Sequence, residues 1–362
     1  MIKLPEMFYS IQRWLFPDLE EELGELTGKQ KEFVRTIELV NPEQYARAYD
    51  WKGVGCKPYD RANIIKAFIL KPIYQFKTTI ALIEQLKSSP TLRRLCGWES
   101  VCDIPSESVF SRTYKAFAMT DLGDRIHEAM VKAAYKDKLV GHISKDSTSV
   151  ASREKSCRKN SRGKKRAKKR CRPTKANEAE KVPRRLEVQP NRSLEENLEN
   201  LPTGCDWGVK KNSKGKIYVW KGYKLHLDCA DGGVPVSAIV SSASMHDSQA
   251  AILLMQMSKE RVVNLYDVMD SAYDAPEIHN FSDRLNHIPI IDNNPRKGDK
   301  IEFEPAKEIR YNERATSERA NSELKDNYGL EDIRVKGQKK VKLHIMFAVI
   351  ALTSKTLFNM LV

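Results

Sequence analysis

The chain has 362 residues and a net charge of +14 at pH 7. A chain of this length can bury a substantial core and is long enough for two domains. Its longest apolar run, residues 345–352, is far shorter than the roughly 20 residues that cross a bilayer, and the first residues lack the apolar segment of a signal peptide, so we expect no membrane partner.

The positive charge is concentrated in one segment. Residues 153–172 hold 12 lysines and arginines and one glutamate, so they carry +11 of the +14. Such a segment indicates a polyanionic partner such as nucleic acid, although a solvated, disordered insertion without a ligand is the alternative. The candidate DNA-contacting side chains in this segment are Arg158, Lys159, Arg162, Lys164, Lys165, Arg166, Lys168, Lys169 and Arg170.

The seven cysteines show no regular spacing and form no Cys-x-x-Cys pair. Cys157 and Cys171 lie in the basic segment without histidines at ligand spacing. This usage favours reduced thiols in a cytoplasmic protein over a zinc site.

Residues 1–135 are predicted to form a helical domain, because apolar residues recur at helical spacing after capping residues. The helix expected after Ser106 has Ser108, Ser111, Arg112 and Lys115 on its polar side. That side could contact DNA, or it could be the solvated surface of a helix bundle. The signals that open the helices are Asn41-Pro42, Asp60, Thr78, Ser89-Pro90 and Ser106.

Residues 136–362 are predicted to form an α/β domain, with a basic and flexible insertion at about 151–205. Its strands alternate with helices after an initial hairpin, which predicts a mixed five-stranded sheet with helices on its faces. The strands are expected at 139–143, 217–227, 234–240, 262–269 and 288–291, and the helices at 248–257, after Pro276, at 311–328 and at 341–362.

Three acids stand where such a sheet could bring them together. Asp146 is expected at the end of the first strand, Asp270 just after the fourth, and Glu318 on a helix packed beside them. Oxygen ligands of this kind suit Mg²⁺ or Mn²⁺, and two such ions support in-line phosphoryl transfer.

Each acid also has a purely structural interpretation. Asp146 could cap a turn, Asp270 could end its strand, and Glu318 could form a surface ion pair with Arg314 worth less than about 1 kcal/mol. The rival acid Asp267 is expected to be embedded in its strand, which makes it the weaker candidate. Only the combination of all three acids indicates a metal site.

Tyr311, Arg314, Glu318 and Lys325 form the pattern Tyr-x2-Arg-x3-Glu-x6-Lys. On a continuous α-helix these side chains project within an arc of about 60°. A carboxylate flanked by two cations and a phenol suits a site that holds a metal ion and a phosphate backbone together.

These residues resemble the DDE-type transposases of insertion sequences, in particular the group marked by the Tyr-Arg-Glu-Lys signature. The spacing of the four signature residues matches completely. Residues 270–274 are similar to that group's Asp-x-Gly-Tyr-Asp segment, with Ala272 in place of the usual glycine. Residues 145–148, 222–226 and 246–248 are also similar to family segments, and parts of 93–106 resemble a helical domain that precedes the catalytic core.

The resemblance implies a ribonuclease-H-like catalytic fold in which Asp146, Asp270 and Glu318 bind Mg²⁺, with Mn²⁺ as a possible substitute. Tyr311, Arg314 and Lys325 would hold phosphates of the transposon end. The activity implied is cutting of the element's ends and joining to target double-stranded DNA, with at least a homodimer pairing the two ends. The alternatives are a ribonuclease-H-like nuclease without strand transfer and a host-adopted DNA-binding protein that no longer catalyses.

Overall fold

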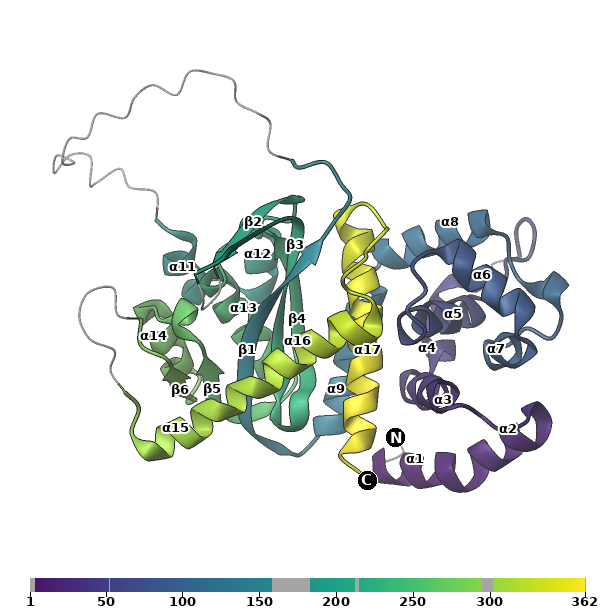
Figure 1. The fold of residues 1–362 in the computed structure, drawn as a ribbon, viewed down its shortest axis with the longest axis horizontal. Coiled ribbons are helices and arrows are strands. Elements are labelled where there is room, and N and C mark those ends of the chain that lie inside the picture. The colour runs from purple at the N-terminus through teal and green to yellow at the C-terminus, as the bar shows by residue number, and fades with distance from the viewer. Residues whose placement is uncertain (1–3, 52, 158–182, 212–214, 295–301, 362) are drawn as a thin grey trace, which may run out of the picture.

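The computed structural model describes residues 4–51, 53–157, 183–211, 215–294 and 302–361 (Figure 1). Up to residue 135 the described chain is helical, as predicted. A π-helical turn joins the first two helices, and short 3-10 turns occur between others. The helices are α1 Leu4–Ser10, α2 Phe16–Leu23, α3 Gly28–Val40, α4 Pro42–Ala46, α5 Arg61–Ile73, α6 Thr79–Ser88, α7 Pro90–Leu95, α8 Glu107–Met119 and α9 Leu122–Tyr135.

Asp60, Thr78 and Ser89 cap their helices with side-chain hydrogen bonds as predicted. Asn41 and Ser106 occupy the position before a helix but form no such bond. Asp60 Oδ1 accepts a hydrogen bond from the backbone N–H of Ala62 at 2.8 Å, which satisfies a free donor at the start of α5. Thr78 Oγ1 does the same for the N–H of Ala81 at 3.1 Å, at the start of α6. The start of these helices is therefore explained by local chemistry alone.

The sheet has six strands in the described chain, one more than predicted. β1 lies between β3, with which it is antiparallel, and β5, with which it is parallel; β6 follows β5 in parallel. β4 and the additional strand β2 pair with different stretches of β3, both antiparallel. The strands are β1 Leu139–Ala151, β2 Asp206–Lys211, β3 Ile217–Ala230, β4 Val234–Ser242, β5 Val263–Met269 and β6 Ile288–Ile291.

The first strand differs from its prediction in length. It was expected at 139–143, but β1 has 13 residues, so Asp146 lies within the strand and not at its end. The sequence pattern missed this extension because Ser144, Lys145, Ser147 and Thr148 are polar and yet buried. Ser144 bonds to Thr316, and Lys145 pairs with Asp228 and Asp267, all of them distant in the sequence.

Helices cover both faces of the sheet. α13 (Ser248–Lys259) packs on β3, β4 and β5, and α14 (Pro276–Arg284) packs on α13 and β6. On the other face lie α9, α16 (Ala315–Tyr328) and α17 (Gln338–Asn359). The described part of the expected 151–205 insertion includes α11 (Arg185–Val188) and α12 (Leu194–Glu199), which pack against α13.

Helix α17 joins the helical region to the sheet. Figure 1 shows it between the two, and it contacts α3, α5, α8 and α9 as well as β4. It is long and apolar enough to span a bilayer, but 83% of its most apolar window is buried inside the protein. The rings of Phe347 on α17 and Phe68 on α5 stack with centroids 6.1 Å apart. This helix therefore forms the centre of a core shared by both parts of the chain.

Candidate functional site

The register of two parallel strands brings Asp146 and Asp270 to the same level of the sheet. β1 and β5 pair with a constant offset of 124 residues, from Leu139 with Val263 to Ser144 with Val268. Asp146 and Asp270 stand two residues further along their strands, with Asp270 directly after the end of β5. The two carboxylates are therefore neighbours at the carboxyl end of the parallel pair.

Both carboxyls lie in a site that disfavours negative charge. Burial raises the pKa of Asp146, and the charge of Asp270 raises it further. Burial also raises the pKa of Asp270, as does the charge of Asp247. Asn321 Nδ2 donates a hydrogen bond to Asp146 Oδ2 at 3.0 Å. Two partly buried carboxylates whose charge is incompletely compensated are a donor set that suits a divalent cation.

The third predicted acid lies on α16, next to β1, but points to a different partner. Glu318 Oε1 forms an ion pair with Arg314 Nη1 at 2.8 Å, and the Glu318 side chain is 51% exposed. The ion pair between Glu318 and Arg314, which was the structural alternative for Glu318 in the sequence analysis, is thus present. Within the described residues, no three His, Cys, Asp or Glu side chains stand together in an arrangement that could hold a metal ion.

The four-residue signature lies on two helices and not on one continuous α-helix. Tyr311 ends α15 (Pro305–Tyr311), a 3-10 turn covers Asn312–Arg314, and α16 carries Glu318 and Lys325. The tighter turn rotates Tyr311 relative to the expected arc. The guanidinium of Arg314 still lies over the Tyr311 ring, 5.7 Å from its centroid.

Arg314 and Lys325 both lie within electrostatic range of the paired acids. Although burial opposes it, the charges of Tyr311, Glu318, Asp270 and Asp146 raise the pKa of Arg314. Burial lowers the pKa of Lys325, and the charge of Asp146 acts in the opposite direction. These two cations and the two acids therefore share one region of the surface of the protein.

Two further charged residues of this region were not singled out from the sequence. The positive charge of Lys210, on β2, lowers the pKa of both Asp146 and Asp270. Asp247, before α13, accepts a hydrogen bond from Lys224 Nζ at 2.8 Å and carries a lowered pKa, because the attraction of His226 and Lys224 outweighs burial. Asp247 had a sequence signal in the segment 246–248, whereas Lys210 had none.

The rival acid Asp267 belongs to a separate, buried ion cluster. Lys145 Nζ lies 3.0 Å from Asp267 Oδ1 and 3.3 Å from Asp228 Oδ2, and all three side chains are almost fully buried. Ser282 Oγ also donates to Asp267 Oδ2 at 2.8 Å. Because successive side chains of a strand point to opposite faces, Lys145 turns away from the side of Asp146. Asp267 is thus embedded in the fold, as expected.

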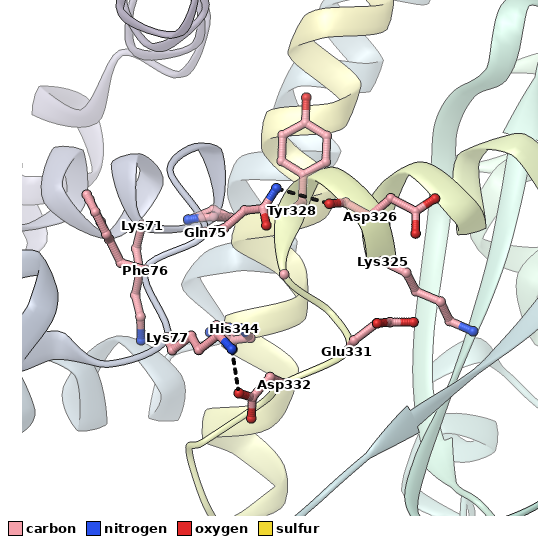
Figure 2. Close-up of a pocket in the computed structure, with 12 residues that line it drawn as sticks. Lys71, Gln75, Phe76, Lys77, Lys325, Asp326, Tyr328, Glu331, Asp332 and His344 are labelled. Atoms are coloured by element: carbon pink, nitrogen blue, oxygen red, sulfur yellow. Dashed lines mark hydrogen bonds and ion pairs between the residues drawn. The ribbon is translucent and has the colours of Figure 1, made fainter.

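A cavity of about 350 Å³ opens between the helical region and the end of α16 (Figure 2). Lys325 lines it together with Lys71, Lys77 and Asp332, of which the last two form an ion pair at 3.3 Å. Lys71 is only 3% exposed and has no carboxylate partner among the described residues. Burial lowers its pKa to about 8.

The expected DNA-contacting surfaces are described only in part. The nine basic residues between Arg158 and Arg170 lie outside the described residues. On α8, the polar side chains of Ser108, Ser111, Arg112 and Lys115 are exposed while the opposite side of the helix is buried.

A mixed sheet in the order β4-β3-β1-β5-β6, with two neighbouring carboxylates at the end of its parallel pair, is the arrangement of a ribonuclease-H-like fold. The family model of the transposase DDE domain matches residues 146–354, more than half of the chain, which therefore belongs to the DDE transposase family. That match begins at Asp146 and includes Asp270 and Glu318. A second model, a transposase domain (DUF772), matches residues 21–116 in the helical region. No curated protein and no solved structure matches the chain.

Proposed function

We propose that this protein is the transposase of an insertion sequence of the Tyr-Arg-Glu-Lys group. It cuts DNA at the ends of its element and joins those ends to target DNA, by phosphodiester hydrolysis and transesterification. Membership of the DDE transposase family supports this function. The observation that carries the proposal is the parallel register of β1 and β5, which makes neighbours of Asp146 and Asp270.

Asp146, Asp270 and Glu318 would hold Mg²⁺ or Mn²⁺. The first two fit this role because burial and neighbouring negative charge raise their pKa, so a cation has uncompensated charge to neutralise. Bound divalent cations supply the activation of the attacking oxygen and the stabilisation of the leaving oxygen. Glu318 must leave Arg314 to take part, and its exposure leaves it free to rotate.

The basic residues would hold the DNA beside these acids. Arg314 offers a planar group of donors that matches phosphate, and it is oriented by Tyr311. Lys325 would bind a second phosphate near the cut. The basic segment 153–172 would add affinity for DNA of any sequence. Pairing of two element ends requires at least a homodimer.

Cleavage of DNA that spans both borders of this reading frame tests the proposal. The full chain is incubated with Mg²⁺, with Mn²⁺ or with a chelator, and both cut and joined products are measured. We expect metal-dependent cutting and joining that Asp270→Asn abolishes and that Asp283→Asn, at an exposed site on α14, leaves intact. Cutting without joined products would indicate a nuclease, and binding without cutting would indicate a non-catalytic DNA-binding protein.

A further inference from the structure

The walls of the cavity beside Lys325 are bonded to each other. One wall is formed by the end of α5 and the turn that follows it, and the other by the end of α16 and the residues after it. Gln75 Nε2 donates a hydrogen bond to the backbone carbonyl oxygen of Asp326 at 3.0 Å, across the two walls (Figure 2). The ion pair of Lys77 with Asp332 connects them a second time. The cavity of about 350 Å³ is therefore a fixed feature of the fold.

Two basic side chains that line this cavity are almost fully buried. Lys71 on α5 is 3% exposed, and His344 on α17 is 8% exposed. Neither side chain forms a hydrogen bond or an ion pair with another described residue. Figure 2 shows both of them to one side of the cavity and Lys325 to the other. The inner part of the cavity thus presents donors that have no partner in the described chain.

The carboxylates around the cavity do not neutralise Lys71. Asp332 is already held by three cations, at 2.9, 3.3 and 3.5 Å. Asp326 and Glu331 are exposed and therefore stand at the opening of the cavity. A buried ammonium group without an anion is unfavourable, because burial removes the water that would otherwise solvate its charge. An anion inside the cavity would restore part of this lost free energy.

The protonation states of the two buried groups define what they can bind. Burial lowers the pKa of Lys71 to about 8, so the ammonium still carries its proton at pH 7. Burial and the charge of Lys71 lower the pKa of His344 to about 3, so the imidazole is neutral and has one N–H donor. A charged group with three donors and a neutral donor therefore line the same space. This combination suits a ligand that is negatively charged and rich in acceptors.

We propose that this cavity binds a small phosphate-type oxyanion, which accepts hydrogen bonds from the ammonium of Lys71 and the imidazole N–H of His344. The inference goes beyond the proposed function and does not depend on it. Hydrogen bonds between an ammonium and an anionic oxygen are among the strongest in proteins. The cavity has room for such an ion and several water molecules, since each water occupies about 30 Å³. A DNA backbone fits less well, because exposed Asp326 and Glu331 would repel a polyanion at the opening.

Thermal unfolding of the full chain, without DNA or divalent metal, tests this site. Phosphate should raise the thermal midpoint at pH 7 by about 2–4 °C over sodium chloride of equal ionic strength, because only the folded chain has the cavity. Lys71→Met should lose this shift, whereas Lys87→Met, at an exposed position on α6, should keep it. Arg314→Gln should also keep it, which would exclude phosphate bound at the proposed DNA contact as the cause.

A second measurement uses the wild type and sulfate, whose charge does not change between pH 7 and pH 9. The protonated fraction of an ammonium with a pKa of about 8 falls about tenfold over this range. The affinity for sulfate, measured by calorimetry, should fall by the same factor, while His344 stays neutral throughout. The decline should persist in Lys325→Gln, which would assign it to Lys71 and not to the lysine on the other side of the cavity.

The outcomes test this inference separately from the proposed function. A wild-type thermal midpoint that phosphate does not raise would overturn it, as would an equal rise in Lys71→Met. A sulfate affinity that stays constant from pH 7 to pH 9 would also overturn it, and this result does not depend on the folding of any variant. None of these measurements involves DNA, so a chain that fails to cut DNA would overturn the proposed function and leave the anion site in place.

Discussion

Arg314 holds Glu318 across one helical turn, with 2.8 Å between Nη1 and Oε1. An exposed pair at this spacing contributes only about 0.3–0.5 kcal/mol. A divalent cation at Asp146 and Asp270 could therefore draw Glu318 away from Arg314 at small cost. Release of Arg314 would in turn free its guanidinium for a DNA phosphate. The Arg314–Glu318 pair thus links the two proposed roles of these residues, metal binding by Glu318 and phosphate binding by Arg314.

Removal of the guanidinium tests this coupling. Arg314→Gln should tighten Mn²⁺ binding by the DNA-free protein about twofold to threefold, because Glu318 no longer has a competing partner. The same variant should bind DNA more weakly. Calorimetric titration with Mn²⁺ measures the first effect, with Arg319→Gln, at an exposed position on α16, as the control. Unchanged Mn²⁺ affinity in Arg314→Gln would separate Glu318 from the metal site.

The raised pKa values of Asp146 and Asp270 predict how stability depends on pH without metal. Because folding raises these pKa values, the folded chain binds more protons than the unfolded chain between the ordinary aspartate pKa of 3.8 and the raised values. The stabilisation from protonating these groups is therefore present at low pH and is lost as pH rises through that window.

Asp270→Asn should consequently raise the thermal midpoint of the metal-free protein at pH 7 and weaken Mn²⁺ binding at least about tenfold. The wild-type affinity for Mn²⁺ should fall as pH decreases, since protons compete for the same oxygens. Calorimetry with and without Mn²⁺ checks both effects, and Asp283→Asn is the matched control. A lower thermal midpoint for Asp270→Asn would show that the Asp270 charge is compensated within the fold.

Several helices and five of the six described strands could be located in the sequence because their signals are local. Asp60 and Thr78 begin helices with their own side chains, and the apolar residues of β5 and β6 identify these segments as strands. The extension of β1 could not be predicted in this way. Ser144 Oγ lies 2.8 Å from Thr316 Oγ1, and Lys145 meets carboxylates from two other strands. From the sequence alone, a run of polar residues predicts a loop, because the distant partners that allow its burial are not known.

The candidate site was foreseen to a similar extent. The expectation that strands would bring Asp146 near Asp270 is confirmed by the register of β1 and β5. Helical spacing allows Glu318 either to pair with Arg314 or to turn toward the other two acids, so the sequence alone could not decide between these positions. In the structure Glu318 pairs with Arg314. Lys210 could not be foreseen, because it lies on β2 and Asp206–Lys211 is too polar to be recognised as a strand. Long-range geometry thus decides which charges meet.

The buried cluster of Lys145, Asp228 and Asp267 predicts a large loss of stability when its cation is removed. Lys145→Met leaves two carboxylates buried without a cation between them, which should destabilise the protein by about 3–5 kcal/mol. Urea denaturation at pH 7 measures the loss, and Lys138→Met, at an exposed position, should be nearly neutral. The deficit should shrink at pH 5, where the unpaired carboxyls protonate more readily. A deficit below about 1 kcal/mol would mean that the carboxyls are already neutral in the wild type.

Lys71 predicts the opposite result, a substitution that stabilises. Its pKa falls from 10.5 to about 8 on folding, because burial disfavours the charge and the described residues offer no carboxylate in contact. Since the unfolded chain holds the proton more tightly, the destabilisation is complete below pH 8 and is relieved as pH rises from about 8 to 10.5. This shift corresponds to about 3 kcal/mol.

Lys71→Met keeps the length of the side chain and removes its charge. It should raise the free energy of unfolding by up to about 3 kcal/mol at pH 7, and the gain should decline between pH 8 and pH 10. Urea denaturation across this pH range tests the prediction, with Lys87→Met, at an exposed position on α6, as the control. If Lys71→Met is less stable than the wild type at pH 7, the Lys71 ammonium has a stabilising partner in the folded chain, and the cavity beside Lys325 does not carry an unpaired charge.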